Sequence, residues 1–585
     1  MKILGYLIIF FLSLLGPACQ KAEKAGDTKP QTLEELEAIA ETYGQFAPPD
    51  AWEEDPNFAY YGSENEFTRR QFSAVSAEKL YKRRGQRQLL EILDGNVDEA
   101  IFLAEFRLEE DASDAESWYI LTVAYSVKGD VTKAAESMKR ALENGMEVTR
   151  FQAGPRDLLK NLTSSYDFGA VTMGLSSRLI HGPMLGSVSD TGASFWFRTV
   201  GEDTVEVRCI DRAGNLAGQA SSQASAAADY TAVVTVDGLK AGTEYRYEVN
   251  VNGETIELAS PAAFKTYTAA GSPGSFKIGV GGCAGYTPYY EYMWSTLASR
   301  QLDAMLMLGD NVYIDIPEMP GAFHDYTYYR RQSQPDFRNL VQSTAMYAIW
   351  DDHDAATDDI WMGPYQDRPV WKQPMVDLFN RNWVNPGTGD AEWPGCWFQF
   401  SVGDVDVFML DGRTYRTNPH KEEKSMLGPV QKEWLLRGLK AAPRPFCVIA
   451  SPVCWASESK PGSNDTWNGF IGEREEIFQY LSDNRIEGVV LLSGDRHRTD
   501  FWKNEREGDY PLYEMMSCRL TNIHTHELMP EAIWGYNEKP SFGIMNFDTT
   551  LDDPEVRFEA VSIDNEMMHS STIKLSEISY SSVSK

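Results

Sequence analysis

Four short apolar stretches of the sequence are each followed by side chains that could bind a metal ion. These side chains are Cys283, Asp310 with Tyr313, the acidic run at 351–354, and Asp495 with His497. Short apolar runs bounded by turn residues predict buried strands, and ligands of α/β proteins gather at the carboxyl edge of the sheet. We therefore expect the Cys, Asp, Tyr and His side chains to meet at one rim.

The carboxylates of this rim argue for bound cations. A single Asp after a strand is usually a helix cap or a turn residue. Several such ends are harder to explain in this way, because carboxylates that lie close together repel one another unless a cation offsets their charge. A carboxylate that bridges two cations suits in-line displacement at phosphorus by a hydroxide held between the metals. Tyr and Cys ligands favour a ferric ion, whereas an all-oxygen site suits calcium or another hard cation.

The elements that must position these residues form an α/β domain, which we place at residues 274–576. Buried strands are expected in "FKIGVGGC", "AMLMLGD", "MYAIWDD", "VDVFMLD", "PFCVIASP" and "GVVLLSGD". Helices are expected in "YYEYMWSTLASR", "PVQKEWLLRGLK" and "REEIFQYLSDN". Strands that alternate with helices are typical of a layered α/β architecture.

Two further modules precede this domain. Residues 79–165 carry a weak repeat of about 34 residues, marked by Gly95 and Gly129, which predicts a small α-helical tetratricopeptide-like module. We expect this module to pack on its neighbour, with binding of a protein partner as the alternative. Residues 175–268 alternate as strands do, and Tyr245 lies in a run that resembles a tyrosine corner. They predict an Ig/fibronectin III-like β-sandwich without chemistry of its own.

The N-terminus predicts export. Residues 1–18 hold Lys2, an apolar run and small residues, which is the pattern of a signal peptide. Cys19 follows directly and resembles the acylated cysteine of a lipoprotein, although Leu15 is one place from its usual position. Residues 19–78 then predict a lipid-anchor linker with a short helix. We expect an exported lipoprotein of the bacterial cell envelope, with simple cleavage elsewhere as the alternative.

Composition bounds the remaining choices. The 585 residues are too many for one core, so several domains are expected. The net charge of -32 argues against nucleic acid as a partner, and it serves either solubility or affinity for cations. Six cysteines remain after Cys19 and contain no CxxC pair, so the sequence leaves any disulfide pairing open.

Six motifs give the chain a family resemblance. The stretches "GDNVY", "IWDDHD", "FMLDGRTYR", "LGPVQKEWL", "DTWNGFIGER" and "LLSGDRHRTDF" occur in this order. Together they resemble the PhoD-like alkaline phosphatase/phosphodiesterase family, within the calcineurin-like metallophosphatases. The resemblance implies an α/β four-layer sandwich and metal-dependent hydrolysis of phosphoesters.

The resemblance also implies roles for single residues. The implied iron ligands are Cys283, Tyr313 and His497, together with Asp310, which would bridge both metals. The implied ligands of the second ion, calcium or another divalent cation, are Asp352, Asp358 and Asp495. His353 would donate a proton to the leaving oxygen or bind phosphate. Arg413 would either bind substrate or brace the site by ion pairs.

The chain departs from the family pattern at two places. No arginine follows Asp310 at once, so Arg330, Arg331 or Arg413 would have to meet the phosphate charge. An acidic pair, Asp358 and Asp359, stands where an asparagine pair is common, so the second site could select another cation. Two other functions stay open. The domain could be an inert binding or scaffold protein that uses the helical repeats, or a non-phosphate hydrolase on the same rim.

Overall fold

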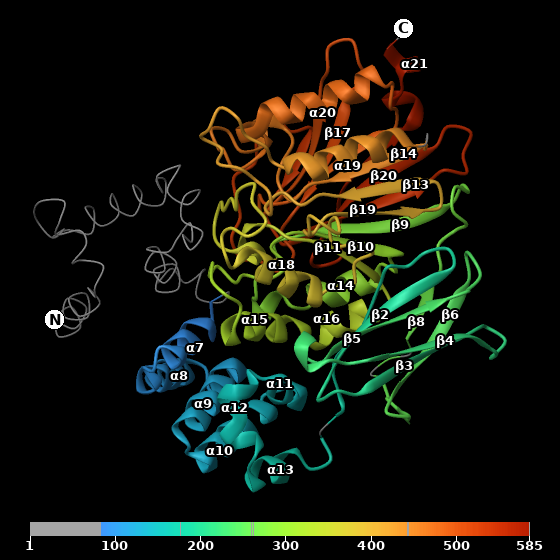
Figure 1. Cartoon of the computed structure of the whole chain (residues 1–585). Helices are drawn as coiled ribbons and strands as arrows, with labels where there is room; N and C mark the ends of the chain where they lie inside the picture. Colours follow the sequence, from blue (N-terminus) through green and yellow to red (C-terminus); the bar gives the residue numbers. More distant parts are fainter. Residues whose placement is uncertain (1–82, 176, 259, 261, 442–443, 584–585) are drawn as a thin grey trace, which may run out of the picture.

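The computed structural model describes residues 83–583, except 176, 259, 261 and 442–443 (Figure 1). The predicted signal peptide, Cys19 and the predicted linker therefore lie outside the described residues. Within the described residues, no helix combines the length and the apolar character that crossing a membrane requires.

Two large sheets form the centre of the molecule. The nine-stranded sheet has the order β21-β20-β19-β9-β10-β11-β1-β2-β5, and the seven-stranded sheet has the order β12-β13-β14-β15-β17-β16-β18. The strands of the first sheet are β1 (Leu179–Gly186), β2 (Gly192–Thr199), β5 (Thr231–Asp237), β9 (Ser275–Gly281), β10 (Ala304–Leu308), β11 (Ala345–Ile349), β19 (Ser541–Asp548), β20 (Glu555–Ser562) and β21 (Met567–Lys574). Those of the second are β12 (Phe398–Val402), β13 (Val405–Met409), β14 (Phe446–Ala450), β15 (Val489–Ser493), β16 (Thr499–Asn504), β17 (Leu512–Ser517) and β18 (Trp534–Tyr536).

Alternation along the strands assigns the two faces of the nine-stranded sheet. Leu306 and Leu308 of β10 belong to the core shared with the seven-stranded sheet, whereas Met305 and Met307 belong to the core under the helices. Successive side chains of a strand point to opposite faces, so both faces of this apolar strand are covered. The result is a layered α/β domain, helix on sheet on sheet on helix (Figure 1).

Helices cover the outer faces of both sheets. On the side of the nine-stranded sheet lie α14 (Met293–Ser299), α15 (Ala322–Gln332) and α16 (Pro335–Val341); α19 (Gly428–Ala441) and α20 (Ile471–Asp483) lie along the seven-stranded sheet (Figure 1). The shorter helices are α17 (Asp352–Ala355), α18 (Lys372–Arg381) and α21 (Tyr580–Val583). The predicted buried strands and the three predicted helices of this domain are thus present.

Parallel pairing brings the ends of the important strands to one edge. β10 is parallel to β9 and to β11, with Ala304 opposite Ile278 and Leu308 opposite Ile349. β14 is parallel to β13 and to β15 in the other sheet. Since the carboxyl ends of parallel strands share an edge, the polar residues after β9, β10, β11 and β15 collect there.

The strands predicted as a separate β-sandwich are instead partly built into the large sheet. β1, β2 and β5 extend the nine-stranded sheet, because β1 is parallel to β11 with Gly186 opposite Met346. The other strands form a small sheet against them; they are β3 (Thr204–Ile210), β4 (Leu216–Gln223), β6 (Glu244–Val251), β7 (Glu254–Thr255) and β8 (Ala263–Lys265). The hydroxyl of Tyr245 accepts a hydrogen bond from the backbone N–H of Lys240 at 2.9 Å, as a tyrosine corner does. The assignment to the Ig/fibronectin III class stays a prediction.

The N-terminal described residues form helical hairpins. The helices are α7 (Gln86–Leu93), α8 (Val97–Glu110), α9 (Ala115–Lys128), α10 (Val131–Glu143), α11 (Val148–Ala153), α12 (Arg156–Thr163) and α13 (Tyr166–Thr172). Gly129 adopts φ 78° after α9, which a glycine does without strain, and Ala134 and Ala141 are fully buried where α9 and α10 pack. These features agree with the repeat in the sequence, while the tetratricopeptide class stays a prediction.

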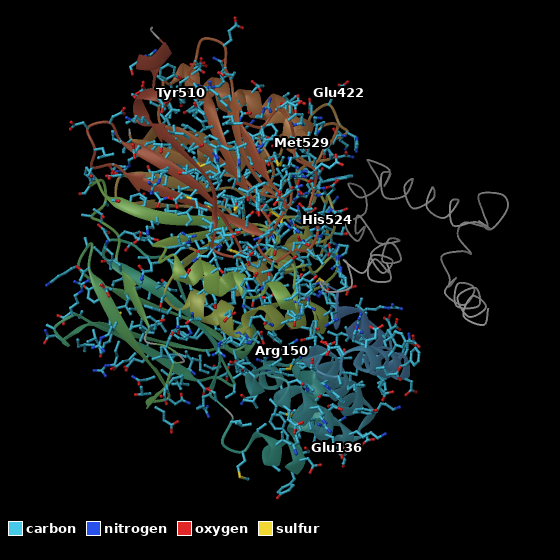
Figure 2. All side chains as sticks on the ribbon, turned by 180° about the vertical axis from the view of Figure 1, so that it is seen from behind. Glu136, Arg150, Glu422, Tyr510, His524 and Met529 are labelled. Carbon is cyan, nitrogen blue, oxygen red and sulfur yellow. A yellow bond between two sulfur atoms is a disulfide. The ribbon has the colours of Figure 1, made fainter. Side chains whose placement is uncertain are left out.

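Arg150 joins the helical module to the α/β domain. Figure 2 shows it at the junction between the helices and the rest of the chain. Its guanidinium is 3.3 Å from Glu116 and lies 4.1 Å from the ring centre of Tyr119 and 4.7 Å from that of Tyr326 in α15. Removing one partner of a buried ion pair costs about 3–5 kcal/mol. That ion pair lies within the module, whereas the contact of Arg150 with Tyr326 and the hydrogen bond that the Tyr326 hydroxyl donates to Glu116 join the module to α15, in line with the packing role expected for it.

Candidate metal centre

The strand ends bring the predicted ligands within reach of one another. The ligand atoms of Cys283, Asp310 and His497 all lie within 4.8 Å of each other, although the residues are far apart in the chain. Asp310 also groups with Asp352 and His353, and Asp352 groups in turn with the pair Asp358 and Asp359. Two carboxylates, Asp310 and Asp352, are thus each shared by neighbouring groups, as the ligands of a pair of ions would be.

The backbone at this rim is held in an uncommon conformation. Cys283, Asp310, Asp495 and His497 have φ values of 53°, 52°, 73° and 48°, in the left-handed region. Non-glycine residues rarely adopt this region, and they do so mostly where the surrounding fold fixes a functional geometry. Four residues at three strand ends that share this conformation point to a site whose side chains are held in fixed directions.

Asp310 has the environment of a metal ligand. Its Oδ2 accepts a hydrogen bond from the Tyr313 hydroxyl at 3.0 Å, whereas its buried Oδ1 has no hydrogen-bond partner within the described residues. Burial raises the pKa of the Asp310 carboxyl well above its usual range; His353 opposes this rise and Asp352 adds to it. A cation at Oδ1 would offset both the burial and the repulsion from Asp352, so this carboxylate fits a metal ion.

Tyr313 lies where the resemblance places an iron ligand. Its oxygen is 3.2 Å from Nε2 of His497, and it accepts a hydrogen bond from Nδ2 of Asn522 at 2.6 Å. Asn522 follows β17 and was not singled out in the sequence, because a lone asparagine in a loop carries no spacing signal. Tyr313, Asp310 and His497 together form a compact oxygen and nitrogen ligand set.

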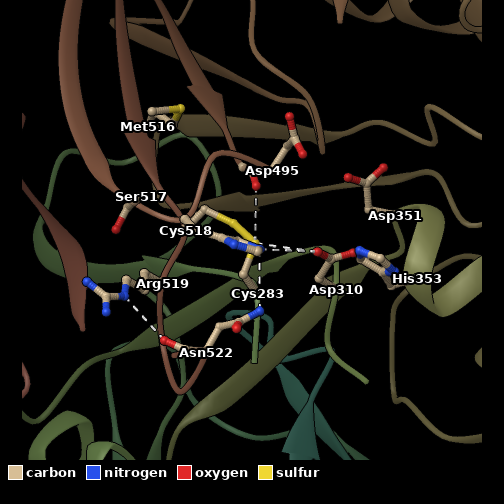
Figure 3. The surroundings of a disulfide bond; sticks show 12 residues. Cys283, Asp310, Asp351, His353, Asp495, Met516, Ser517, Cys518, Arg519 and Asn522 are labelled. Carbon is tan, nitrogen blue, oxygen red and sulfur yellow. Dashed lines mark hydrogen bonds and ion pairs between the residues drawn. A yellow bond between two sulfur atoms is a disulfide. The ribbon is translucent and has the colours of Figure 1, made fainter. Parts of the chain in front are cut away.

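Cys283 does not fit its implied role in this structure. Its sulfur forms a disulfide with Cys518, with the two Cα atoms 5.4 Å apart, and lies 3.5 Å from Oδ2 of Asp310 (Figure 3). The thiolate is the form of cysteine that ligates metals, and a disulfide sulfur is not a thiolate. The position agrees with the resemblance, but Cys283 could ligate iron only after reduction. The disulfide pairing, which the sequence left open, involves the rim itself.

His353 is held by a carboxylate that the sequence motifs did not highlight. Nδ1 of His353 contacts Asp315, which is fully buried and also pairs with Arg83 at the start of the helical module. Although burial opposes the charged form, Asp315, Asp352 and Asp310 raise the pKa of the His353 imidazole well above its usual range. His353 is thus set up to carry a proton at the rim, as its implied role requires.

Arg413 lies behind the rim rather than on its open face. Its side chain is fully buried; Nε donates to Asp351 at 2.5 Å and Nη1 donates to Asp465 at 2.6 Å. Asp352 is 3.9 Å from its guanidinium. Of the two roles considered for Arg413, the geometry corrects the catalytic one and supports the bracing one, because a guanidinium buried among these carboxylates has no face open to substrate.

Asp495 is paired with a cation that sequence reasoning missed. Its carboxylate is 3.3 Å from Nζ of Lys460, which also lies 3.4 Å from both Asp359 and Asp465. Asp495 belongs to none of the ligand groups found among the described residues. Its expected place on the second ion therefore stays a prediction.

Arg330 and Arg331, which the sequence offered as partners of the phosphate charge, make other contacts. Arg330 donates to the backbone oxygen of Arg84, and Arg331 pairs with Glu291.

This fold and this rim define a class: layered α/β proteins in which side chains that could hold metal ions gather at the strand ends. Residues 278–518 match the model of the PhoD-like phosphatase family. Residues 176–269 match a second model, described as a domain of unknown function (DUF7800).

Two relatives place the family match in context. Alkaline phosphatase D of Bacillus subtilis (strain 168) is 23% identical over 332 residues, which are 47% of this chain and 54% of that protein. The chain thus matches about half the length of this curated relative. A solved structure of PhoD aligns with a TM-score of 0.55 at 15% identity, over 67% of this chain and 92% of that one. This likeness supports the fold.

Proposed function

We propose that the protein hydrolyses phosphoesters, either monoesters or diesters, with metal ions held at the rim. The observation that carries this proposal is Asp310, a buried carboxylate shared by two ligand groups and with one oxygen that lacks a hydrogen-bond partner in the described part of the chain. The PhoD-like family supports it. Two ions bound at such a carboxylate would supply Lewis acidity and an activated water for in-line displacement at phosphorus.

The two ions would be held by different sets of ligands. Asp310, Tyr313 and His497 would hold a ferric ion, joined by Cys283 only in its reduced form. Oxygen ligands from Asp310, Asp352 and Asp358 would hold calcium or another divalent cation, since hard cations prefer carboxylates. The identity of both metals belongs to the proposal.

Three side chains would serve the substrate and the leaving group. His353 would donate its proton to the leaving oxygen, with Asp315 and Arg83 fixing its ring. Lys460, partly exposed and charged, would meet the phosphate charge in place of the arginine that the chain lacks after Asp310. This role for Lys460 rests on its place at the rim between Asp359 and Asp495.

The experiment is an assay with aryl phosphate monoesters and diesters on protein of measured metal content. Asp310→Asn should lose bound metal and at least about 100-fold in turnover, because one shared carboxylate serves both ions. Asp552→Asn, at an exposed loop position, is the matched control and should change neither quantity. Metal-loaded protein that turns over no phosphoester would refute the function, and full activity of Asp310→Asn would refute the bridging role.

We also propose that the protein acts in the bacterial cell envelope, anchored by a lipid on Cys19. The support is the sequence of residues 1–19 and the Cys283–Cys518 disulfide, which suits an oxidising compartment. Replacing Cys19 by alanine should move the protein from the membrane fraction to the soluble fraction. Retention of that variant in the membrane fraction would exclude the anchor.

A further inference from the structure

Three imidazole rings gather at the rim, around His497. The ligand nitrogens of His497, His524 and His526 lie within 4.8 Å of one another, and the ring centres are 4.6–5.5 Å apart. The whole chain contains only eight histidines. Three of them therefore meet at one place, although a loop His-x-His pair alone carries little weight.

Backbone hydrogen bonds fix the loop that carries two of these rings. The Thr525 hydroxyl donates to the backbone oxygen of His497 at 3.0 Å, and the Asn537 amide donates to the backbone oxygen of His526 at 2.9 Å. The backbone N–H of His524 donates to Oδ1 of Asn522 at 3.1 Å. The loop is thus tied to the backbone of His497 through the Thr525 hydroxyl, and the imidazole rings lie close together in this arrangement.

We propose that His497, His524 and His526 bind a first-row divalent transition metal such as zinc or cobalt. This site is distinct from the one formed by the carboxylates of Asp310 and Asp352. Three imidazoles form a nitrogen donor set, which zinc, cobalt, nickel and copper prefer and calcium does not. His524 is exposed, so its ring can close the remaining distance to a metal–nitrogen length of about 2.0–2.1 Å. A fourth position would be left for water or substrate.

The Cys283–Cys518 disulfide favours metal binding at the three histidines. His497 is shared with the group of Cys283 and Asp310, and Cys283 is tied to Cys518. In this disulfide form, the group of Cys283, Asp310 and His497 offers no thiolate. Zinc and cobalt, which bind nitrogen and sulfur donors, therefore find more suitable donors in the three histidines. The inference concerns metal binding alone and does not depend on phosphoester hydrolysis.

The test is cobalt binding to the oxidised full chain, followed by visible absorption and by counting bound ions after dialysis. The wild type should show d–d bands of a nitrogen-ligated Co²⁺, and the double variant His524→Ala with His526→Ala should lose them together with one bound ion. His420→Ala, an exposed histidine outside the group, is the matched control and should leave both unchanged.

Further variants distinguish a failure of this metal site from a failure of the proposed phosphoester hydrolysis. Asp310→Asn should abolish turnover yet keep the cobalt bands, because that carboxylate is not one of the three donors. Unchanged cobalt stoichiometry and spectrum in the double histidine variant would overturn the inference, whatever its activity. Phosphate binding by the histidines without metal uptake would overturn it as well.

Discussion

The rim has two halves that are built differently. The closed half consists of Cys283, Asp310, Tyr313 and His497, all at most 6% exposed and contributed by the ends of β9, β10 and β15. The open half consists of Asp352, His353, Asp358 and Asp359, which come from one stretch after β11. The Asp358 side chain is 64% exposed. Asp352 is as buried as the closed half, so the open half reaches the surface through the acidic pair Asp358 and Asp359.

The two halves also balance their charge differently. In the closed half, the hydroxyl of Tyr313 and the amide of Asn522 hold the ligands in a hydrogen-bond network, and a disulfide fixes the sulfur. In the open half, Arg413 and Lys460 already offset the carboxylates. A metal in the closed half is therefore selected by ligand chemistry, whereas one in the open half is selected by charge and exchanges more easily.

The largest expected effect comes from freeing Cys283. Replacing Cys518 with serine, or reducing the wild type with a dithiol, converts the disulfide to a thiol at Cys283 and adds a thiolate donor to the closed half. We expect ferric affinity to rise about 10–100-fold, with a new sulfur-to-iron absorption band. Iron titrations followed by visible spectroscopy measure both.

The control for this change is Cys447→Ser, since Cys447 is a buried free cysteine on β14. It should leave iron affinity unaltered. If Cys518→Ser and the reduced wild type both bind iron as the oxidised protein does, the closed half does not depend on Cys283, and the implied iron ligation is wrong.

The same contrast explains what the sequence could predict. Each strand end is a local signal, an apolar run followed by Asp, Cys or His, so the sequence could predict that Asp310, His353 and His497 gather at one rim, while their roles stay predictions. The partners of these residues are not local. Arg83 reaches Asp315 from the start of the helical module, and Lys460 reaches Asp495 from a loop with no motif. Contacts of this kind depend on how whole elements pack, which periodicity does not encode.

The β-strands before the α/β domain follow the same rule. Their alternation and the run around Tyr245 predicted strands correctly, because half-buried strands alternate. Alternation does not say which strand pairs with which sheet. The pairing of Gly186 with Met346, which joins β1 to β11, could therefore not be predicted from the sequence.

An intermediate effect is expected from the support of His353 in the open half. Asp315→Asn removes the carboxylate that most raises the pKa of His353, so that pKa should fall. An acid catalyst loses its proton as pH rises through its pKa, so the alkaline limb of kcat should move to lower pH. Turnover on esters with poor leaving groups should drop about 10-fold, and less on aryl esters.

The control for this prediction and the result that would contradict it are both read from the pH dependence of turnover. Asp325→Asn removes another largely buried acid, which pairs with Arg381 away from the rim, and should keep the pH profile. An Asp315→Asn profile that matches the wild type in both limbs and in leaving-group dependence would show that His353 is not the proton donor.

The smallest expected effect tests the loop that links the two halves. His324 is buried in α15; its Nδ1 accepts from the Gly321 N–H at 3.2 Å and its Nε2 donates to the Ile316 oxygen at 3.2 Å. One ring nitrogen accepts and the other donates, so the imidazole is neutral in the folded chain. Burial accordingly lowers the pKa of His324 from 6.5 to about 4.

Because the folded pKa is lowered, this histidine contributes stability above about pH 6.5 that is lost as pH falls towards 4. Linkage gives a loss of about 2 kcal/mol at pH 5 relative to pH 7. His324→Gln keeps a donor for Ile316 but cannot take up a proton, so its unfolding midpoint in urea should fall less between these two pH values than that of the wild type. His420→Gln, at an exposed position, should show the full wild-type loss. An equal loss in His324→Gln would mean that the acid sensitivity arises instead from other histidines whose pKa burial lowers, such as His181 and His526. The loop after Asp315 would then not limit stability in acid.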